Sequence, residues 1–164
     1  MTLSFKFLSQ CNAGDLLRVK IEDVAEFAIV GEAQGYSQRA LVVLKDTVPP
    51  FAINVLESGH YTGDFETFAA LVYGKCDILP NHSDYCEIGV GPLFTRVGAF
   101  ILADDGSKSL VVASNKTVRY FDFTSWELHG EPGGQRAAFK TWSLWHDGLA
   151  PSVPSVRLLG YSVE

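Results

Sequence analysis

The sequence contains only three cysteines and no long hydrophobic run, and each shortage excludes a class of protein. An odd number of cysteines gives no complete disulfide framework, so Cys11, Cys76 and Cys86 are expected to be free thiols in a reducing compartment such as the cytoplasm. No apolar stretch approaches the roughly 18–20 residues that a membrane helix needs. Residues 1–8 alternate apolar and polar and lack the features of a secretory signal, so they are expected to form a first strand.

Positive charge is also scarce. The chain has 13 Lys and Arg against 19 Asp and Glu, which gives a net charge of −6, and like charges do not gather in blocks. Affinity for nucleic acid depends on cationic side chains that neutralise phosphates, and the same holds for anionic membranes. The charge therefore favours a protein or small-molecule partner over nucleic acid and a membrane surface. A homo-oligomer is compatible with it, and so is an acidic mimic of nucleic acid with its carboxylates on one face.

Common catalytic signatures are missing as well. The sequence has no phosphate-binding glycine pattern, no GxSxG, no HExxH and no CxxC. Gly89-Val90-Gly91 is a bare GxG followed by Pro92, and we interpret it as a turn. No cofactor is predicted.

The composition that remains is that of a folded β protein. Apolar residues make up 47% of the chain and charged residues 20%, which is enough apolar surface for a real core. The 11 Phe and 6 Tyr favour strands, because aromatic side chains suit a half-buried pleated surface. Short strands separated by Gly and Pro predict an all-β fold, mostly antiparallel with little helix, arranged as a sandwich or barrel.

The chain also resembles itself when it is shifted by about 70 residues, which is a sign of internal repeats. Thr47 falls on Thr117 and Phe51 on Phe121, and Pro80 meets Pro151 after a one-residue change of shift. The matches keep chain order and fall on apolar and turn positions. We therefore predict a duplicated β-meander with pseudo-twofold symmetry, with repeats at 1–90 (including an extra N-terminal strand) and 91–164. The repeats are expected to form one compact unit, either a sandwich or two fused small barrels.

Each half is expected to contain a hairpin, a third strand and a last strand. In the first half the hairpin joins 26–31 to 39–45, the third strand is 51–57 and the last is 85–90. In the second half the hairpin joins 99–103 to 109–113, the third strand is 119–128 and the last is 156–161. Asp105-Gly106 predicts a tight turn in the second hairpin, because both residue types tolerate positive φ. The fourth element is ambiguous. Helical spacing with Asp64 as a cap leaves helix or strand open at 64–73, whereas 139–145 alternates like a strand.

Three weak site candidates follow from residue chemistry. The first is a metal site formed by Cys76, His82 and Cys86, since thiolate and imidazole are ligands that zinc prefers. The spacing matches no established zinc signature, and a fourth ligand is missing. A metal site is therefore not favoured.

The second candidate is a catalytic or metal-binding cluster of acidic and imidazole side chains in the second half. Such groups carry out acid–base work or hold a metal when a sheet brings them together. Its members are Glu127, His129, Glu131, His146 and Asp147.

The third candidate is an aromatic contact surface for a ligand or partner formed by Tyr120, Trp142 and Trp145. Trp142 and Trp145 are three residues apart and would face opposite sides of a regular strand. At most one of the two is therefore expected on the core face.

None of these patterns identifies a function. The leading hypothesis is a soluble, non-enzymatic binding or assembly module, which an exposed aromatic patch would favour. The alternative is a small metal-dependent or acid–base enzyme of hydrolase or isomerase type that uses the second cluster, and a deep polar pocket would favour it. A nucleic-acid mimic or inhibitor is a further alternative.

Overall fold

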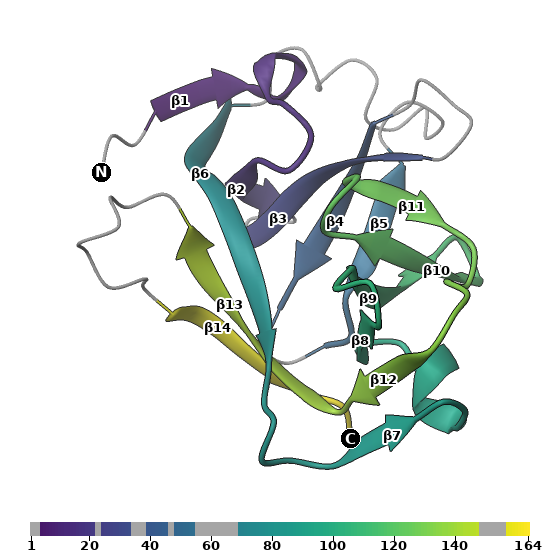
Figure 1. Ribbon diagram of the computed structural model, residues 1–164. Helices are drawn as coiled ribbons and strands as arrows, with labels where there is room; N and C mark the ends of the chain where they lie inside the picture. The colour runs from purple at the N-terminus through teal and green to yellow at the C-terminus, as the bar shows by residue number, and fades with distance from the viewer. Residues whose placement is uncertain (1–3, 22–23, 34–38, 46–47, 55–68, 148–156) are drawn as a thin grey trace.

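The computed structural model describes residues 4–21, 24–33, 39–45, 48–54, 69–147 and 157–164 (Figure 1). Its first strands are β1 (Ser4–Phe7), β2 (Leu16–Ile21), β3 (Val24–Ala33), β4 (Arg39–Leu44), β5 (Phe51–Asn54), β6 (Ala69–Pro80) and β7 (Cys86–Ile88). The later strands are β8 (Phe100–Ala103), β9 (Lys108–Ser114), β10 (Thr117–Asp122), β11 (Glu127–His129), β12 (Arg136–Phe139), β13 (Thr141–Asp147) and β14 (Arg157–Ser162). The helical elements in this part of the chain are two short 3₁₀ turns, η1 (Leu8–Gln10) and η2 (Pro92–Thr95), so the all-β prediction is confirmed.

Six strands close into a barrel, visible in the right half of Figure 1. The meander β3-β4-β5 and the meander β9-β10-β11 are each antiparallel. Two parallel joints complete the ring, one between β5 and β9 and one between β11 and β3. A closed ring leaves no open edge among its own strands.

The remaining strands extend the sheet away from the ring. β2, β6, β13 and β14 follow one another outward from β3, and β1 pairs with β6. On the other side, β8, β12 and β7 follow outward from β9. β14 and β7 therefore end the sheet at its two extremities.

Two hydrophobic cores lie on opposite faces of β4. Val42 belongs to the larger core, which also takes in apolar side chains from the other ring strands, with Ala52 of β5 only partly buried against it, and from β2, β6, β8, β12, β13 and β14. Leu41 and Val43 belong to the smaller core, together with residues of η1, β2, β3 and β6. Burying an aliphatic side chain of this size stabilises a fold by roughly 1.5–3 kcal/mol. Both faces of this strand thus contribute, which explains its unbroken apolar sequence.

The predicted hairpins are present. The predicted strands 26–31 and 39–45 correspond to β3 and β4, and 99–103 and 109–113 correspond to β8 and β9, with Lys45 and Ala99 just outside the observed strands. Gly106 has a φ of 85° and its N–H donates to Ala103 O at 3.0 Å. The Asp-Gly sequence therefore forms the expected tight turn.

The predicted strand at 119–128 is wrong in its middle. The chain leaves the sheet after Asp122 and returns at Glu127. The Asp122 carboxylate accepts hydrogen bonds from the N–H groups of Thr124 and Ser125, at 2.6 and 2.8 Å, and Trp126 has a φ of 61°. A local side-chain acceptor of this kind competes with the sheet for backbone donors and produces a turn.

The helical alternative at 64–73 is also wrong for the part that the structure describes. Residues 69–73 lie in β6, while 64–68 lie outside the described residues. A bulge at Gly74, with a φ of 93°, shifts the pairing between β6 and β2. Val72 therefore faces the smaller core and Cys76 the larger one. Because the bulge moves the buried side chains of β6 from one core to the other, its sequence does not show the regular two-residue alternation of a strand.

The duplication stays a prediction, as do the repeat boundaries at 90 and 91. The sequence match equates β3-β4-β5 with β8-β9-β10, and both stretches are antiparallel meanders. The two parallel joints of the ring instead relate β3-β4-β5 to β9-β10-β11. The counterpart of β3-β4-β5 suggested by the sequence match therefore differs by one strand from the counterpart suggested by the strand pairing of the barrel.

Among the described residues, no helix has both the length and the apolar character needed to cross a lipid bilayer.

Candidate functional site at the β7 edge

The outer edge of β7 is open in the described part of the chain. β7 ends the sheet and pairs with β12 alone (Figure 1, lower right). Gly89 N–H donates to Arg136 O at 2.9 Å, and Lys140 N–H donates to Tyr85 O at 3.2 Å. Because backbone groups alternate in direction along a strand, those of Cys86 and Ile88 point to the open side, where Ile88 O accepts a hydrogen bond from Val90 N–H at 3.1 Å.

The same segment exposes large apolar side chains. Tyr85 is 59% exposed, Ile88 81% and Val90 87%, and the thiol-bearing Cys86 between them is also exposed. We call Tyr85, Cys86, Ile88 and Val90 the β7 edge. Natural proteins usually protect an open strand with charge, proline or a covering element, so an open apolar edge is typical of an interaction surface.

The strands next to β7 in the sheet also carry apolar side chains in line with the β7 edge. In the register of β7, β12 and β8, Ile88 lies beside Ala137, which lies beside Leu102. These three side chains share one face, because directly paired residues of adjacent strands project the same way. A strand added outside β7 would place a side chain next to Ile88 and lengthen this row.

Glu87 fixes the edge from the other face of the strand. Its carboxylate accepts a hydrogen bond from Leu93 N–H at 2.7 Å and one from the Tyr85 hydroxyl at 3.3 Å. Gly91 packs so closely on this carboxylate that a Cβ atom there would collide with it. The nearby negative charge of Glu87 raises the pKa of Tyr85. Glu87 thus ties the edge to η2.

Asp84 adds a second carboxylate beside the edge. It accepts hydrogen bonds from the Thr141 hydroxyl and from the backbone N–H of Tyr85. These bonds, in that order, lower the pKa of Asp84, and the positive charge of Lys140 adds to the effect. Asp84 and Glu87 therefore place two carboxylates beside the edge, with Lys140 close to Asp84.

The predicted acid–base cluster is not assembled. His129 Nε2 lies 3.8 Å from Asp122 Oδ2 and its Nδ1 donates to Gly130 O, so both ring nitrogens face partners. Glu131 forms an ion pair with Arg136. His146 is buried on β13, and the side chain of Asp147 lies outside the described residues.

Glu127, the remaining member of the predicted cluster, begins β11 and pairs with Glu32 of β3 rather than with an imidazole. Within the described residues, no three His, Cys, Asp or Glu side chains gather closely enough to hold a metal ion. The turn after Asp122 and the separate place of β13 send the described members of the predicted cluster in different directions.

The structure pairs His146 with a residue that sequence reasoning did not connect to it. His146 and Cys76 are direct cross-strand neighbours on β13 and β6, and both are buried. His146 Nε2 donates to Tyr73 O, while its Nδ1 is buried without a hydrogen-bond partner. The two residues are distant in sequence, and only the strand register brings them together. Their burial keeps a substrate from reaching them.

The predicted metal candidates are separated. Cys76 is buried in β6 and Cys86 is exposed on β7, and neither forms a disulfide. His82 lies in the exposed turn between these strands, where its ring packs edge-on against Phe139 with ring centroids 5.6 Å apart. The three side chains therefore do not form a common ligand set.

Two of the three predicted contact aromatics are core residues. Trp142 stacks on Tyr161, with ring centroids 5.3 Å apart, and its Nε1 donates to Gly98 O at 2.7 Å. Tyr120 is buried and its hydroxyl donates to Phe94 O at 2.9 Å. Their polar atoms are satisfied inside the protein, so neither offers a surface to a partner. Trp145 is partly exposed, with Nε1 donating to Ser143 Oγ at 2.7 Å.

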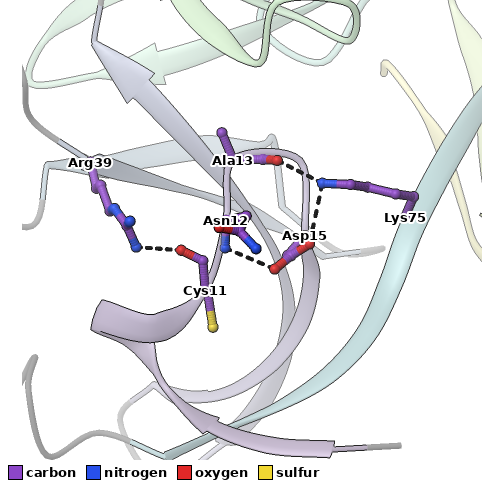
Figure 2. Close-up of polar contacts among 6 residues, drawn as sticks. All are labelled: Cys11, Asn12, Ala13, Asp15, Arg39 and Lys75. Atoms are coloured by element: carbon purple, nitrogen blue, oxygen red, sulfur yellow. Dashed lines mark hydrogen bonds and ion pairs between the residues drawn. The ribbon is translucent and has the colours of Figure 1, made fainter. Parts of the chain in front are cut away.

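A polar cluster around the buried Asp15, which the sequence did not reveal, fastens the segment between β1 and β2. Figure 2 shows Lys75 Nζ bound to Ala13 O at 2.7 Å and to the Asp15 carboxylate at 3.2 Å. The other Asp15 oxygen accepts from Asn12 N–H at 2.8 Å, and Arg39 donates to Cys11 O. Each of these polar groups has a partner within the protein, so the cluster's evident role is to hold this segment on the barrel.

Comparisons with protein-family models, with curated proteins and with solved structures found no match for this chain.

Proposed function

We propose that this protein is a non-enzymatic binding or assembly module that accepts an extended protein strand at the β7 edge. The observation that carries the proposal is the open side of β7, where Ile88 and its exposed neighbours lie next to the outward-pointing backbone groups of Cys86 and the N–H of Ile88. An added strand gains main-chain hydrogen bonds from the edge and specificity from alternate side chains. Both ingredients are present at this position.

The chemistry of the edge specifies the partner. Cys86 and Ile88 project to one face of the strand and Glu87 to the other, with Asp84 nearby. A complementary strand alternates apolar side chains, which extend the Ile88 row, with cationic side chains, which face the carboxylates. An acidic or uniformly polar strand would gain neither contact.

The enzyme alternative has less support in the described residues. His129 and Glu131 already have partners, and His146 is buried. A catalytic base must reach the proton that it removes, and none of these side chains is free at an open surface. The proposal also keeps the protein in a reducing compartment such as the cytoplasm, where its three thiols would stay reduced.

A peptide titration followed by NMR tests this function. A short synthetic peptide that alternates leucine and lysine is added to the isotope-labelled protein, and backbone chemical shifts are followed. We expect the largest changes at residues 85–90, and we expect Ile88→Lys to abolish them. Val118→Lys, which alters another exposed valine on β10, should leave binding intact.

Two results would contradict the proposal. One is equal binding of a peptide that alternates leucine and glutamate, since the edge would then not select by charge. The other is binding of the leucine–lysine peptide that Ile88→Lys leaves unchanged, since the contact would then lie elsewhere.

A further inference from the structure

We infer that the chain carries its own partner strand, and that β1 of a second copy docks at the β7 edge. This inference rests on the proposed function and names the occupant of the same site. It starts from a second exposed apolar feature, on β1, which pairs with β6 far from β7 (Figure 1).

β1 presents its side chains in the reverse of the usual order. Phe5 is 78% exposed and Phe7 46% exposed, while Ser4 and Lys6 are less accessible. A strand on the surface of a fold normally turns its apolar residues inward. Two aromatic rings at alternate positions on one outward face therefore indicate a surface that another molecule covers.

The charge around β1 is opposite to that around β7. Lys6 lies between the two phenylalanines in sequence, and Arg18 lies in the same cross-strand row as Phe5, with Leu71 between them. The β7 edge has Asp84 and Glu87 in the corresponding places. In a chain of net charge −6, a basic apolar strand and an acidic apolar edge are complementary surfaces.

The residue patterns also match in register. Phe5-Lys6-Phe7 alternates apolar, cationic and apolar, and Cys86-Glu87-Ile88 alternates apolar, anionic and apolar. Antiparallel docking places Phe5 beside Ile88, Lys6 beside Glu87 and Phe7 beside Cys86. Cross-strand pairs of these types stabilise a sheet.

Some backbone groups on the outer edge of β1 already have partners, and this limits the strength of the contact between β1 and β7. Phe7 N–H donates to Gln10 Oε1 at 3.1 Å and Phe7 O accepts from the Cys11 thiol at 3.6 Å. Within the described residues, Phe5 thus retains open backbone groups on this edge, whereas Ile88 O opposite it already accepts from Val90 N–H. Side-chain packing therefore supplies most of the association. Both surfaces are much smaller than a standard protein interface, so the assembly is expected to be weak and concentration-dependent.

The arrangement determines the kind of assembly. β1 and β7 lie at opposite ends of the molecule in Figure 1, so a copy does not satisfy its own edge. Contact between two different surfaces is heterologous, and each added copy presents a fresh edge. The expected products are head-to-tail oligomers rather than a closed dimer.

Sedimentation velocity over a wide concentration range tests the inference with two blocked variants. One carries Phe5→Ser together with Phe7→Ser, and the other carries Ile88→Lys. We expect the wild-type chain to self-associate, and each blocked variant to raise the dissociation constant about tenfold or more. Val118→Lys is the control that should assemble like wild type.

Mixing the two blocked variants is the decisive step. Each retains one intact surface, so a head-to-tail contact predicts a one-to-one heterodimer that grows no further. A two-fold contact between identical surfaces predicts no such rescue and would overturn the inference. Wild-type chain that stays monomeric, or that assembles despite either blocked surface, would overturn it as well.

The outcomes separate this inference from the proposed function. If wild type is monomeric but binds the leucine–lysine peptide at residues 85–90, the second-copy inference fails and the binding function stands. If neither self-association nor peptide binding occurs, both fail.

Discussion

The indole ring of Trp126 packs directly on Gly14, where a Cβ atom would lie 2.5 Å from Trp126 Cε2. Lys75 Nζ lies 5.7 Å from the centroid of the same ring, within reach of a cation–π interaction. Gly14 N–H donates to Val30 O at 2.7 Å, so the segment before β2 is held against β3 as well. The absence of a side chain at position 14 thus allows the N-terminal segment to sit on the barrel.

Gly14→Ala is therefore expected to destabilise the protein strongly. Gly14 has a φ of 83°, which by itself costs an alanine about 1–2 kcal/mol, and the clash with the indole adds to this. Gly106→Ala is the matched control, because Gly106 has a φ of 85° and nothing within 4 Å of its Cβ position. Urea denaturation should show a clearly larger loss for position 14, and equal losses would show that the indole simply moves aside.

The ion pair between Asp15 and Lys75 should contribute little by itself. Asp15 is buried, but Lys75 is about half-exposed, and solvent screens such a pair to about 1 kcal/mol or less. A double-mutant cycle with Asp15→Asn and Lys75→Met, followed by urea denaturation, measures the coupling. Asp15→Asn alone should cost more than the coupling energy, because the Asn12 N–H loses its charged acceptor. A coupling of several kcal/mol would contradict this account.

Thiol reactivity should distinguish the three cysteines. Cys86 is exposed, while Cys11 and Cys76 are buried. Burial raises the pKa of Cys11, and the charge of Asp15 raises it further, so little thiolate forms there. An aromatic disulfide reagent should label one thiol rapidly in the native protein and all three after denaturation. Loss of the rapid phase in Cys86→Ser, but not in Cys11→Ser, would identify the reactive group.

Asp84 should titrate below its ordinary range, and Thr141 should be the main reason. A carboxyl group with a lowered pKa in the folded state contributes stability above its unfolded pKa and loses it as the pH falls through the folded pKa. Thr141→Val removes the hydroxyl donor, so the midpoint of Asp84 should rise toward 3.8. NMR titration of side-chain carboxyl carbons measures this shift.

Asp105 provides an internal control for the same titration. Its pKa is lowered by hydrogen bonds from Ser107, on a different turn. The midpoint of Asp105 should stay unchanged in Thr141→Val. A parallel shift at both carboxyls would point to a general change in the fold rather than to the lost hydroxyl.

The local structure of this protein was largely predictable from its residues. The hairpin around Gly106 was predictable because Asp-Gly both permits and signals a tight turn. Phe5 and Phe7, by contrast, alternate with polar residues like an ordinary half-buried strand, and only the fold shows that they face outward. Alternation identifies the two faces of a strand but not which of them faces the core.

Long-range relationships could not be predicted in this way. The buried neighbours His146 and Cys76 meet through a strand register, and Asp15 meets Lys75 across another. No spacing rule in the sequence connects such pairs. The open edge at Ile88 was likewise hidden, because a short apolar strand has the same sequence whether it lies inside a sheet or at its end.

The two parallel joints of the barrel also determine when the protein can finish folding. Leu128 pairs with Ala33, about a hundred residues earlier in the chain, so this closure pays a large loop-entropy cost before it gains any contacts. During synthesis, β3, β4 and β5 can form their meander long before β11 leaves the ribosome. A nascent chain therefore carries a half-built barrel wall with open edges until β11 has been made, and completion depends on this three-residue strand arriving late.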